Sequence, residues 1–423
     1  MPAAPERTPR ALLRSLFDAA VAAAHPKVCV PPHLPAPPEK GRTIVVGAGK
    51  AAAAMARAVE DHWKGPLSGL VVTRDGYGVP CLKIEMIQAA HPVPDERGRA
   101  AAGRMLELAR NAKPDDLVLC LMSGGASALL VLPAPGVALA DKQATTRALL
   151  KSGATIHEIN CVRKHLSAIK GGRLAAASPA RLLTLAISDV VGDDPSVIGS
   201  GPTVPDPSTF ADARAILAKY KIEPAPVVRA HLEAAADETP KPGDPRLARA
   251  EYRLVATPKD ALEAAAAKAR EFGLEPILLG QNVEGEARAV GAEHAALARK
   301  LSADSNQKKP AVILSGGELT VTIKGRGSGG PSTEYLLGLA LALKGARGIH
   351  ALAADTDGID GSEDNAGAVI GPDTLARARD FTLDAAGCLA SNDAYSFFRA
   401  LGDLLVTGPT FTNVNDFRAI LVQ

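Results

Sequence analysis

Short apolar segments alternate with helix-like segments along the first half of this 423-residue chain. The apolar segments lie at 43–46, 117–122 and 182–188, and none of them alternates polar with apolar residues. Helical patterning fills the intervals, for example at 51–63 and 95–110. A strand that is apolar at every position is typical of a parallel sheet that is covered by helices on both faces. We therefore predict an α/β fold with a Rossmann-like parallel sheet in the N-terminal part.

A stretch rich in Pro, Gly and charged residues at 236–250 marks the expected boundary between two domains. Strand-like and helix-like segments resume at 252–257 and continue to the last residues, FRAILVQ. We predict an N-terminal Rossmann-like domain over residues 1–240 and a smaller C-terminal α/β domain over residues 241–423.

The composition argues against several classes of protein. Lys and Arg number 48 and Asp and Glu 46, so the chain lacks the basic excess of a nucleic-acid-binding protein. No two of the five cysteines have CxxC spacing, which disfavours a disulfide framework or a zinc cluster. The first ten residues are polar, and glycines and prolines interrupt the most apolar stretch, 117–140. We expect a cytoplasmic protein that binds neither nucleic acid nor a membrane.

The turn Gly47-Ala48-Gly49-Lys50 lies between a predicted strand and a predicted helix. Its glycines allow backbone N–H groups to face an anion at the helix N-terminus. The turn nearly fits the dinucleotide fingerprint, with Ala52 at the third glycine position and Asp75 after the next strand. It does not fit the Walker A loop, because Ile44 takes the first glycine position. Lys50 favours a carboxylate or phosphate ligand, and a purely structural turn is the alternative.

Two Ser-Gly-Gly turns, Ser123-Gly124-Gly125 and Ser315-Gly316-Gly317, each follow an apolar strand. The carboxyl end of such a strand is where α/β folds bind ligands, and the backbone N–H groups of the turn could hold phosphate oxygens. A tight structural turn is again the alternative. A hydrolase nucleophile elbow around Ser127 is disfavoured, because Leu129 fills its last glycine position.

Carboxylates crowd two loops that follow apolar strands. Asp189, Asp193 and Asp194 follow the segment 182–188, and Asp355 and Asp357 begin a second acidic loop. One or two carboxylates with substrate phosphate oxygens suit Mg²⁺. The alternatives are a solvated acidic loop with a helix cap and a loop of Asx-turns.

A glycine-dense segment, Lys324 to Gly330, contains Lys324 and Arg326 and precedes a predicted helix that is capped near Ser332 or Thr333. A flexible loop with two cations at a helix N-terminus could clamp a phosphate. A disordered hairpin tip is the alternative interpretation.

Taken together and in order, these motifs resemble the glycerate 2-kinases with a C-terminal MOFRL domain. The resemblance rests on NCVRKHLSAIKGGRLA (160–175), AISDVVGDDPSVIGSGPTVPDPST (186–209), SGGELTVTIKGRGSGGPSTEY (315–335), AADTDGIDGSEDNAGAV (353–369) and TGPTFTNVNDF (407–417), with GAGKAAAAMA (47–56) and HPVPDERG (91–98) in agreement.

The resemblance implies two α/β domains with an active site in the cleft between them. It implies transfer of the γ-phosphoryl group of ATP to the 2-hydroxyl of D-glycerate, with Mg²⁺, to give 2-phosphoglycerate and ADP. Relatives have often been labelled hydroxypyruvate reductases, so an NAD(P)H-dependent reductase is the alternative. In that account Lys50, the acidic loops and the second glycine-rich loop would have no role. A homodimer is the assembly to be tested.

The resemblance also implies roles for individual residues. Lys50 and Arg326 would be catalytic or bind substrate and phosphate, and Asp189 would be catalytic or hold Mg²⁺ together with Asp355 and Asp357. Further roles fall to Gly49 and Asn160 in substrate binding and to Ser123, Gly124, Gly125, Ser315, Gly316, Gly317 and Glu318 in nucleotide binding. The family usually has glycine where this chain has Phe411, which raises a question about the shape of that turn.

Overall fold

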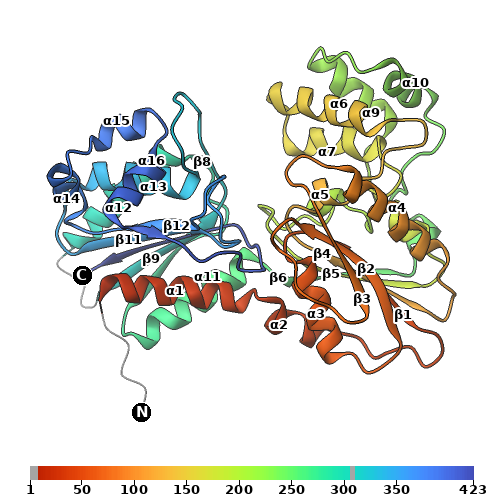
Figure 1. Cartoon of the computed structure of the whole chain (residues 1–423), viewed down its shortest axis with the longest axis horizontal. Coiled ribbons are helices and arrows are strands. Elements are labelled where there is room, and N and C mark those ends of the chain that lie inside the picture. The colour runs from red at the N-terminus through yellow and green to blue at the C-terminus, as the bar shows by residue number, and fades with distance from the viewer. Residues whose placement is uncertain (1–7, 305–309) are drawn as a thin grey trace. The chain divides into compact units, whose positions relative to one another are not determined.

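The computed structural model describes residues 8–304 and 310–423, which form two compact units (Figure 1). The first unit comprises residues 26–255, and the second unit combines residues 256–423 with the N-terminal helix α1 (Pro9–Ala23). This division differs from the expected split after residue 240. Strand β6 (Ala250–Ala256) completes the sheet of the first unit beside β5 (Arg181–Ile187), so the chain leaves that unit only after β6.

Helix α1 belongs to the second unit because its apolar face packs there. Leu13, Leu16, Phe17 and Ala20 are buried, and the Phe17 ring meets Phe417 edge-to-face at 5.9 Å. Burial of such a face supplies most of the stability of an amphipathic helix. The sequence predicts a helix here, and the structure shows which sheet it covers.

The first unit contains a six-stranded sheet in the order β3-β2-β1-β4-β5-β6, in which β1 to β5 pair in parallel. This is the strand order of a doubly wound Rossmann sheet, and it confirms the predicted fold class. The order reverses between β1 and β4, which is the position where such sheets bind ligands. The strands not bounded above are β1 (Thr43–Ala48), β2 (Leu67–Arg74), β3 (Ile84–Ala89) and β4 (Leu117–Met122).

Helices pack on this sheet, and four others form a cluster of their own. Figure 1 shows α3 and α4 on opposite faces of the sheet and α6, α7, α9 and α10 grouped beyond its end. The group has a separate apolar core that includes Leu149, Val162, Phe210 and Leu232. The helices of the unit are α2 (Pro26–Cys29), α3 (Ala52–His62), α4 (Glu96–Arg110), α5 (Ala126–Leu129), α6 (Leu139–Lys151), α7 (Ile156–His165), α8 (Arg173–Ala176), α9 (Phe210–Lys219) and α10 (Pro226–Ala234).

The second unit contains a mixed six-stranded sheet in the order β13-β12-β11-β14-β9-β7. Within this sheet β7 and β9 pair in parallel, and the other pairs are antiparallel, while β8 and β10 form a separate two-stranded parallel sheet. Helices α1 and α11 lie along one face, and α12 and α13 along the other (Figure 1). The strands are β7 (Glu275–Gly280), β8 (Gly285–Glu286), β9 (Ala311–Gly317), β10 (Leu319–Thr320), β11 (Ile349–Asp355), β12 (Gly367–Ile370), β13 (Leu404–Leu405) and β14 (Asp416–Val422). The helices are α11 (Pro258–Glu271), α12 (Ala287–Ser302), α13 (Pro331–Leu343), α14 (Thr374–Asp380), α15 (Ala385–Ala390) and α16 (Ala394–Leu401).

Among the described residues, no helix combines the length and the apolar character that crossing a bilayer requires.

His294, in the core of the second unit, makes the stability of the fold depend on pH. Its Nδ1 lies 2.8 Å from the Tyr335 hydroxyl, and burial lowers its pKa from 6.5 to about 4. The unfolded chain takes up a proton near pH 6.5, whereas the folded protein does so only near pH 4, so stability is lost as the pH falls through this window. We expect protonation of this group to lower the free energy of unfolding by roughly 3 kcal/mol across the window. Urea denaturation of the wild type and of His294→Gln at several pH values measures it, and an identical pH slope in both would contradict the assignment.

Candidate active site

The turns that end β1 and β4 interlock at the point where the strand order of the first sheet reverses. The backbone N–H of Lys50 donates to the Gly124 carbonyl at 2.8 Å, and the N–H of Ala51 donates to Ser123 Oγ at 3.0 Å. The Thr73 hydroxyl donates to the Lys50 carbonyl at 3.2 Å. The main chain of Lys50 is therefore held by two hydrogen bonds, and that of the next residue, Ala51, by a third, just before helix α3.

Gly49 and Gly125 allow the turns after β1 and β4 to approach each other closely. A Cβ atom on Gly49 would lie 2.1 Å from Ser123 Oγ, and Gly49 has a φ of 137°. A Cβ atom on Gly125 would lie 3.1 Å from the His91 ring and 3.4 Å from Lys50 Cγ. The structure thus brings together Gly49, Lys50, Ser123, Gly124 and Gly125, all expected site residues, and adds His91.

We expect Gly125→Ala to destabilise the protein more than a matched glycine variant does. Gly125 and Gly136 have nearly the same φ, 81° and 82°, but a Cβ atom on Gly136 would have nothing within 4 Å. Both variants suffer left-handed strain of about 1–2 kcal/mol, and only Gly125→Ala adds the contact with His91. Its free energy of unfolding should fall by about 1 kcal/mol more than that of Gly136→Ala. Urea denaturation measures the difference, and equal losses would mean that the space beside Gly125 is not restricted.

Asn160 joins a buried polar network next to these turns. Ser200 Oγ donates to Asn160 Oδ1 at 3.2 Å and lies 2.9 Å from Ser127 Oγ, and Arg163 also donates to Asn160. Ser200 has a φ of 63° between two glycines that are also left-handed. Left-handed backbone at a non-glycine residue persists only where its surroundings hold it, and such residues cluster at functional sites. The network links the carboxyl end of β4 to the expected substrate residue Asn160.

Asp189 lies two residues after the end of β5 and is half-buried, in the loop that also holds Asp193 and Asp194. Asp194 accepts hydrogen bonds from the backbone and the hydroxyl of Ser196, so it serves as the local cap that the alternative interpretation foresaw. Burial raises the pKa of the nearby Tyr252 phenol, and the charges of the three aspartates raise it further. The loop is therefore a concentration of negative charge at a strand end.

In the second unit, the ends of three adjacent strands place expected site residues at one edge of the sheet. Asp416, the first residue of β14, pairs with Gly317 of β9 on one side and with Asp355 of β11 on the other. Ser315, Gly316, Gly317 and Asp355 therefore share this edge. Burial raises the pKa of Asp416 to about 7, while the buried guanidinium of Arg418 opposes the shift.

The acidic loop after β11 is built from local hydrogen bonds. Asp355 Oδ1 accepts from the Asp357 backbone N–H, and Asp357 Oδ1 accepts from the Ile359 backbone N–H, both at 2.8 Å. These are Asx-turns, as one of the two sequence interpretations proposed. Among the described residues, no cluster of three or more His, Cys, Asp or Glu side chains has the arrangement of a metal site.

Asp360 of the same loop caps helix α13. It accepts from the backbone N–H groups of Ser332 and Thr333, both at 2.9 Å, and from the Thr333 hydroxyl at 2.7 Å. Burial nevertheless raises its pKa to about 6. The sequence suggested that the N-terminus of α13 could bind a phosphate, but in the structure the carboxylate of Asp360 accepts its hydrogen bonds.

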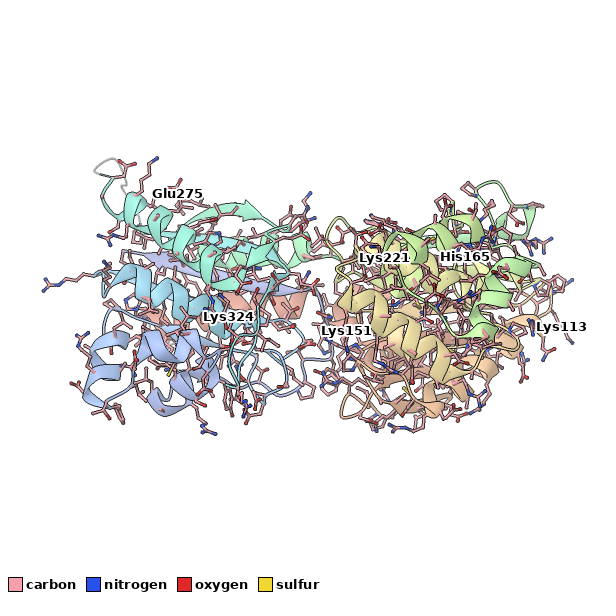
Figure 2. All side chains as sticks on the ribbon, turned by 90° about the horizontal axis from the view of Figure 1, so that it is seen from above. Lys113, Lys151, His165, Lys221, Glu275 and Lys324 are labelled. Atoms are coloured by element: carbon pink, nitrogen blue, oxygen red, sulfur yellow. The ribbon has the colours of Figure 1, made fainter. Side chains whose placement is uncertain are left out.

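The glycine-dense loop that carries Arg326 is anchored through its backbone. The N–H groups of Lys324 and Gly325 donate to Asn392 Oδ1 at 2.7 and 3.0 Å, and that of Gly327 donates to the Ser391 carbonyl at 3.0 Å. The side chains of Lys324, labelled in Figure 2, and of Arg326 are exposed. The exposed Glu318 lies between β9 and β10.

Comparison with known proteins identifies the family of this chain. The family described as a domain of unknown function, DUF4147, matches residues 12–233, and the MOFRL family matches residues 311–416. A glycerate 2-kinase of Pyrococcus horikoshii is 40% identical over 90% of this chain and 88% of its own length. The chain belongs to the family of glycerate 2-kinases with a C-terminal MOFRL domain.

Other relatives in this family carry two different names. The crystal structure of a glycerate kinase from Thermotoga maritima has a TM-score of 0.88 and 38% identity, and it covers 97% of this chain and 99% of its own. A relative from Agrobacterium vitis, 56% identical over 98% of this chain and 94% of its own length, carries a hydroxypyruvate reductase label. The family assignment predicted from the motifs is confirmed.

Phe411 shows why its turn favours glycine. Its φ is 60°, in the left-handed region where a side chain is unfavourable. Glycine adopts such a conformation without strain, which fits the glycine that the family resemblance implies at this position.

Sequence reasoning missed His91, Ser200, Asp360 and Asp416. His91 stands inside the motif HPVPDERG and Asp416 inside the motif TGPTFTNVNDF, and neither motif by itself indicates a site role for the residue. Their significance comes from pairing and packing between segments that are distant in the sequence.

Proposed function

We propose that the protein is an ATP-dependent glycerate 2-kinase, which transfers the γ-phosphoryl group of ATP to the 2-hydroxyl of D-glycerate. The observation that carries the proposal is the position of Lys50. Lys50 lies where the turns after β1 and β4 interlock. Proteins named glycerate 2-kinase match this chain over most of its length and of their own. A nicotinamide-dependent reductase gives no role to a lysine within this turn.

The reaction needs positioning and charge neutralisation rather than covalent help from the protein. The 2-hydroxyl oxygen attacks the γ-phosphorus, the bond to the ADP oxygen breaks, and the hydroxyl proton passes to a base. We assign Lys50 and Arg326 to the negative charge on the transferred group. Asp189, Asp355 and Asp357 share two tasks, positioning the hydroxyl and holding the metal.

The remaining expected site residues bind the two substrates. Gly49 and Asn160, with Lys50 and Arg326, bind D-glycerate, whose carboxylate and hydroxyls match cationic and amide partners. The nucleotide is assigned to the two Ser-Gly-Gly turns and Glu318, that is, to Ser123, Gly124, Gly125, Ser315, Gly316, Gly317 and Glu318.

Carboxylate oxygens at Asp189, Asp355 and Asp357 are hard donors of the kind that Mg²⁺ prefers. Mg²⁺ usually takes one or two carboxylates and fills its shell with water and substrate phosphates, so the proposal does not require a ready-made cluster. When bound, the metal would shield the phosphate charge during the attack.

One assay separates the kinase from the reductase. Protein incubated with ATP, Mg²⁺ and D-glycerate should produce ADP and 2-phosphoglycerate in equal amounts. A parallel sample with NADH and hydroxypyruvate should show no loss of NADH absorbance. NADH consumption without phosphoglycerate would overturn the proposal in favour of the reductase.

Asp189→Asn tests the acidic loop of the first unit. We expect turnover to fall about a hundredfold, the scale for losing a general base, with little change in melting temperature because the side chain lies in a loop. Asp194→Asn is the matched control. It replaces one of the two carboxylate oxygens that accept from Ser196 with an NH2 group, and it should lower the melting temperature slightly while turnover is retained. Normal turnover and Mg²⁺ dependence in Asp189→Asn would remove this residue from the site.

A further inference from the structure

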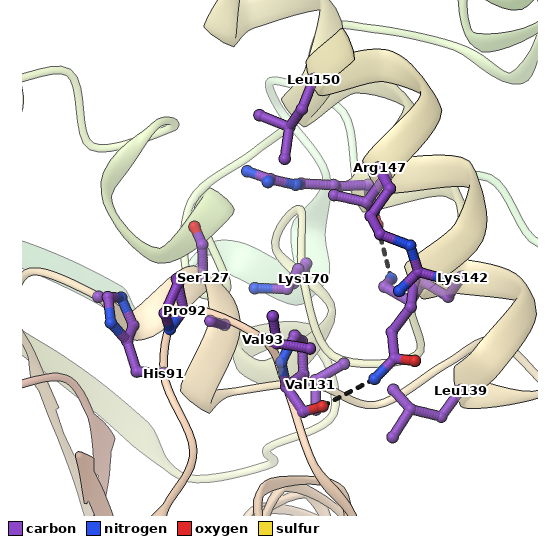
Figure 3. Close-up of a pocket in the computed structure, with 16 residues that line it drawn as sticks. His91, Pro92, Val93, Ser127, Val131, Leu139, Lys142, Arg147, Leu150 and Lys170 are labelled. Carbon is purple, nitrogen blue, oxygen red and sulfur yellow. Dashed lines mark hydrogen bonds between the residues drawn. The ribbon is translucent and has the colours of Figure 1, made fainter. Parts of the chain in front are cut away.

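A cavity of about 280 Å³ lies in the first unit, between helix α6 and the turns that follow β3 and β4 (Figure 3). Its volume is close to the lower limit of small-molecule pockets, roughly 300 Å³. Apolar side chains form part of the wall, among them Val93, Val131, Leu139 and Leu150. It therefore has room for a small molecule or for one end of a larger one.

Four cationic side chains line the same cavity. Lys142 and Arg147 come from α6, Arg163 from α7, and Lys170 from the loop after α7. Among the described residues that form the wall, none carries a carboxylate. The hydroxyl of Ser127 also faces this space in Figure 3. The wall is thus rich in hydrogen-bond donors and carries positive charge only.

The two lysines are buried and contact neutral acceptors. Lys142 Nζ donates to the carbonyls of Arg163 and Leu166 at 2.9 and 2.6 Å, and Lys170 Nζ donates to the Gly199 carbonyl at 3.0 Å. Burial lowers the pKa of Lys142 to about 7 and that of Lys170 well below its ordinary value, and neighbouring cations lower both further. Burying like charges together is unfavourable, so these lysines give up their protons more readily than in water unless an opposite charge joins them.

An anion would supply that charge. Lys164, close by, has such a partner, because Asp206 lies 3.3 Å from its Nζ. Lys142 and Lys170 donate to backbone carbonyl groups instead. Uncharged side chains at these positions would stabilise a purely structural core better, which indicates that the two lysines have another role. Arg147 is exposed at the rim, where it can meet an incoming anion.

We propose that this cavity binds an oxyanion, a carboxylate or phosphate group, between Lys142, Arg163 and Lys170 with Arg147 closing the site at its rim, and with any apolar portion of the ligand against Val131 and Leu139. Guanidinium and ammonium groups around one space are the usual partners of such groups. Gly125, which the proposed function assigns to the nucleotide, also lines this cavity, so the cavity adjoins that site, but the inference is argued from the cavity and does not rest on the kinase reaction. The oxyanion could belong to a hydroxy acid, a nucleotide or free phosphate.

Calorimetric titration of the full-length protein distinguishes these sources. Inorganic phosphate, D-glycerate and ADP are titrated separately, without metal, into the wild type, Arg147→Gln, Lys170→Met and Lys151→Met. At least one probe should bind, and Arg147→Gln and Lys170→Met should each weaken it about tenfold or more, the scale for a charge-assisted hydrogen bond. Lys151 is exposed at the end of α6 and does not line the cavity, so Lys151→Met should bind as the wild type does.

The result is read against melting curves of the same samples. Lys170→Met removes a buried cation and should melt at the same temperature or higher. If that variant fails to fold, Arg147→Gln, at an exposed position, decides the matter. Absence of binding by all three probes, or binding that neither variant weakens, overturns the proposal. Retained binding in a protein that does not phosphorylate glycerate leaves this proposal standing and removes only the kinase.

Discussion

We expect Lys50→Ala to lower the turnover of glycerate phosphorylation by a factor of about 10²–10³, which is the scale for losing one preorganised charge stabiliser. The hydrogen bonds that hold this turn use the backbone N–H and carbonyl of Lys50, and alanine keeps both. Lys50 comes two residues before the first residue of α3, so its positive charge belongs to the segment at the positive end of the helix dipole. A cation is unfavourable at that position unless an anion shares the site, so the variant should melt within about 2 °C of the wild type or slightly above it.

Lys64→Ala is the matched control, because Lys64 is an exposed lysine just beyond the other end of α3. It should retain full turnover and the same melting temperature. The two variants are compared by steady-state kinetics and by thermal melting on the same preparations. A Lys50→Ala protein that melts well below the wild type yet phosphorylates glycerate at the normal rate would make Lys50 a structural residue.

The strands of the first unit could be predicted because their sequence pattern is local. Segments such as 43–46 and 117–122 are apolar at each position, and the structure places both at the centre of a parallel sheet. The extent of each unit could not be predicted in the same way. Whether α1 covers one sheet or the other depends on contacts such as Phe17 with Phe417, which are about 400 residues apart in the sequence.

The candidate site likewise has features that the sequence predicts and features that only the tertiary structure shows. Glycine-rich turns at strand ends are visible in the sequence, and the turns after β1 and β4 prove to interlock through Lys50 and Gly124. The capping of α13 by Asp360, which lies 28 residues from Ser332, is set by tertiary structure. The cationic cavity is likewise assembled from α6, α7 and the loop beyond them, so Lys142 and Lys170 show their shared environment only in the folded unit.

Phe411 illustrates a third case, in which the resemblance raised a question that only the backbone could answer. A bulky residue at a position that usually holds glycine suggested a changed turn. The backbone instead has a φ of 60°, the conformation that glycine adopts without strain. The backbone at Phe411 is thus left-handed although the residue carries a large side chain.

Arg326→Ala should reduce turnover by about 10²–10³-fold as well, for a reason that the loop geometry supplies. The glycines on either side of Arg326 are pressed against the segment between α15 and α16. A Cβ atom on Gly325 would lie 2.1 Å from the Ser391 carbonyl oxygen, and one on Gly327 would lie 2.3 Å from Asp393 Cβ. Backbone hydrogen bonds to Asn392 and Ser391 hold the loop in place. The guanidinium is thus presented to solvent from an anchored loop, a placement that suits neutralisation of phosphoryl charge.

Because the Arg326 side chain is exposed, its removal should change the free energy of unfolding by no more than about 0.5 kcal/mol. Lys324→Ala removes an equal charge from the same loop and serves as the control, with turnover within about threefold of the wild type, since an exposed charge that does not face the reaction contributes little. Initial rates at saturating ATP and D-glycerate, with urea denaturation of each variant, give both quantities. Equal losses of turnover in Arg326→Ala and Lys324→Ala would mean that the loop acts through its overall charge. Full turnover in Arg326→Ala would remove the loop from the reaction, and the charge on the transferred phosphoryl group would then have to be met by Lys50 and the metal.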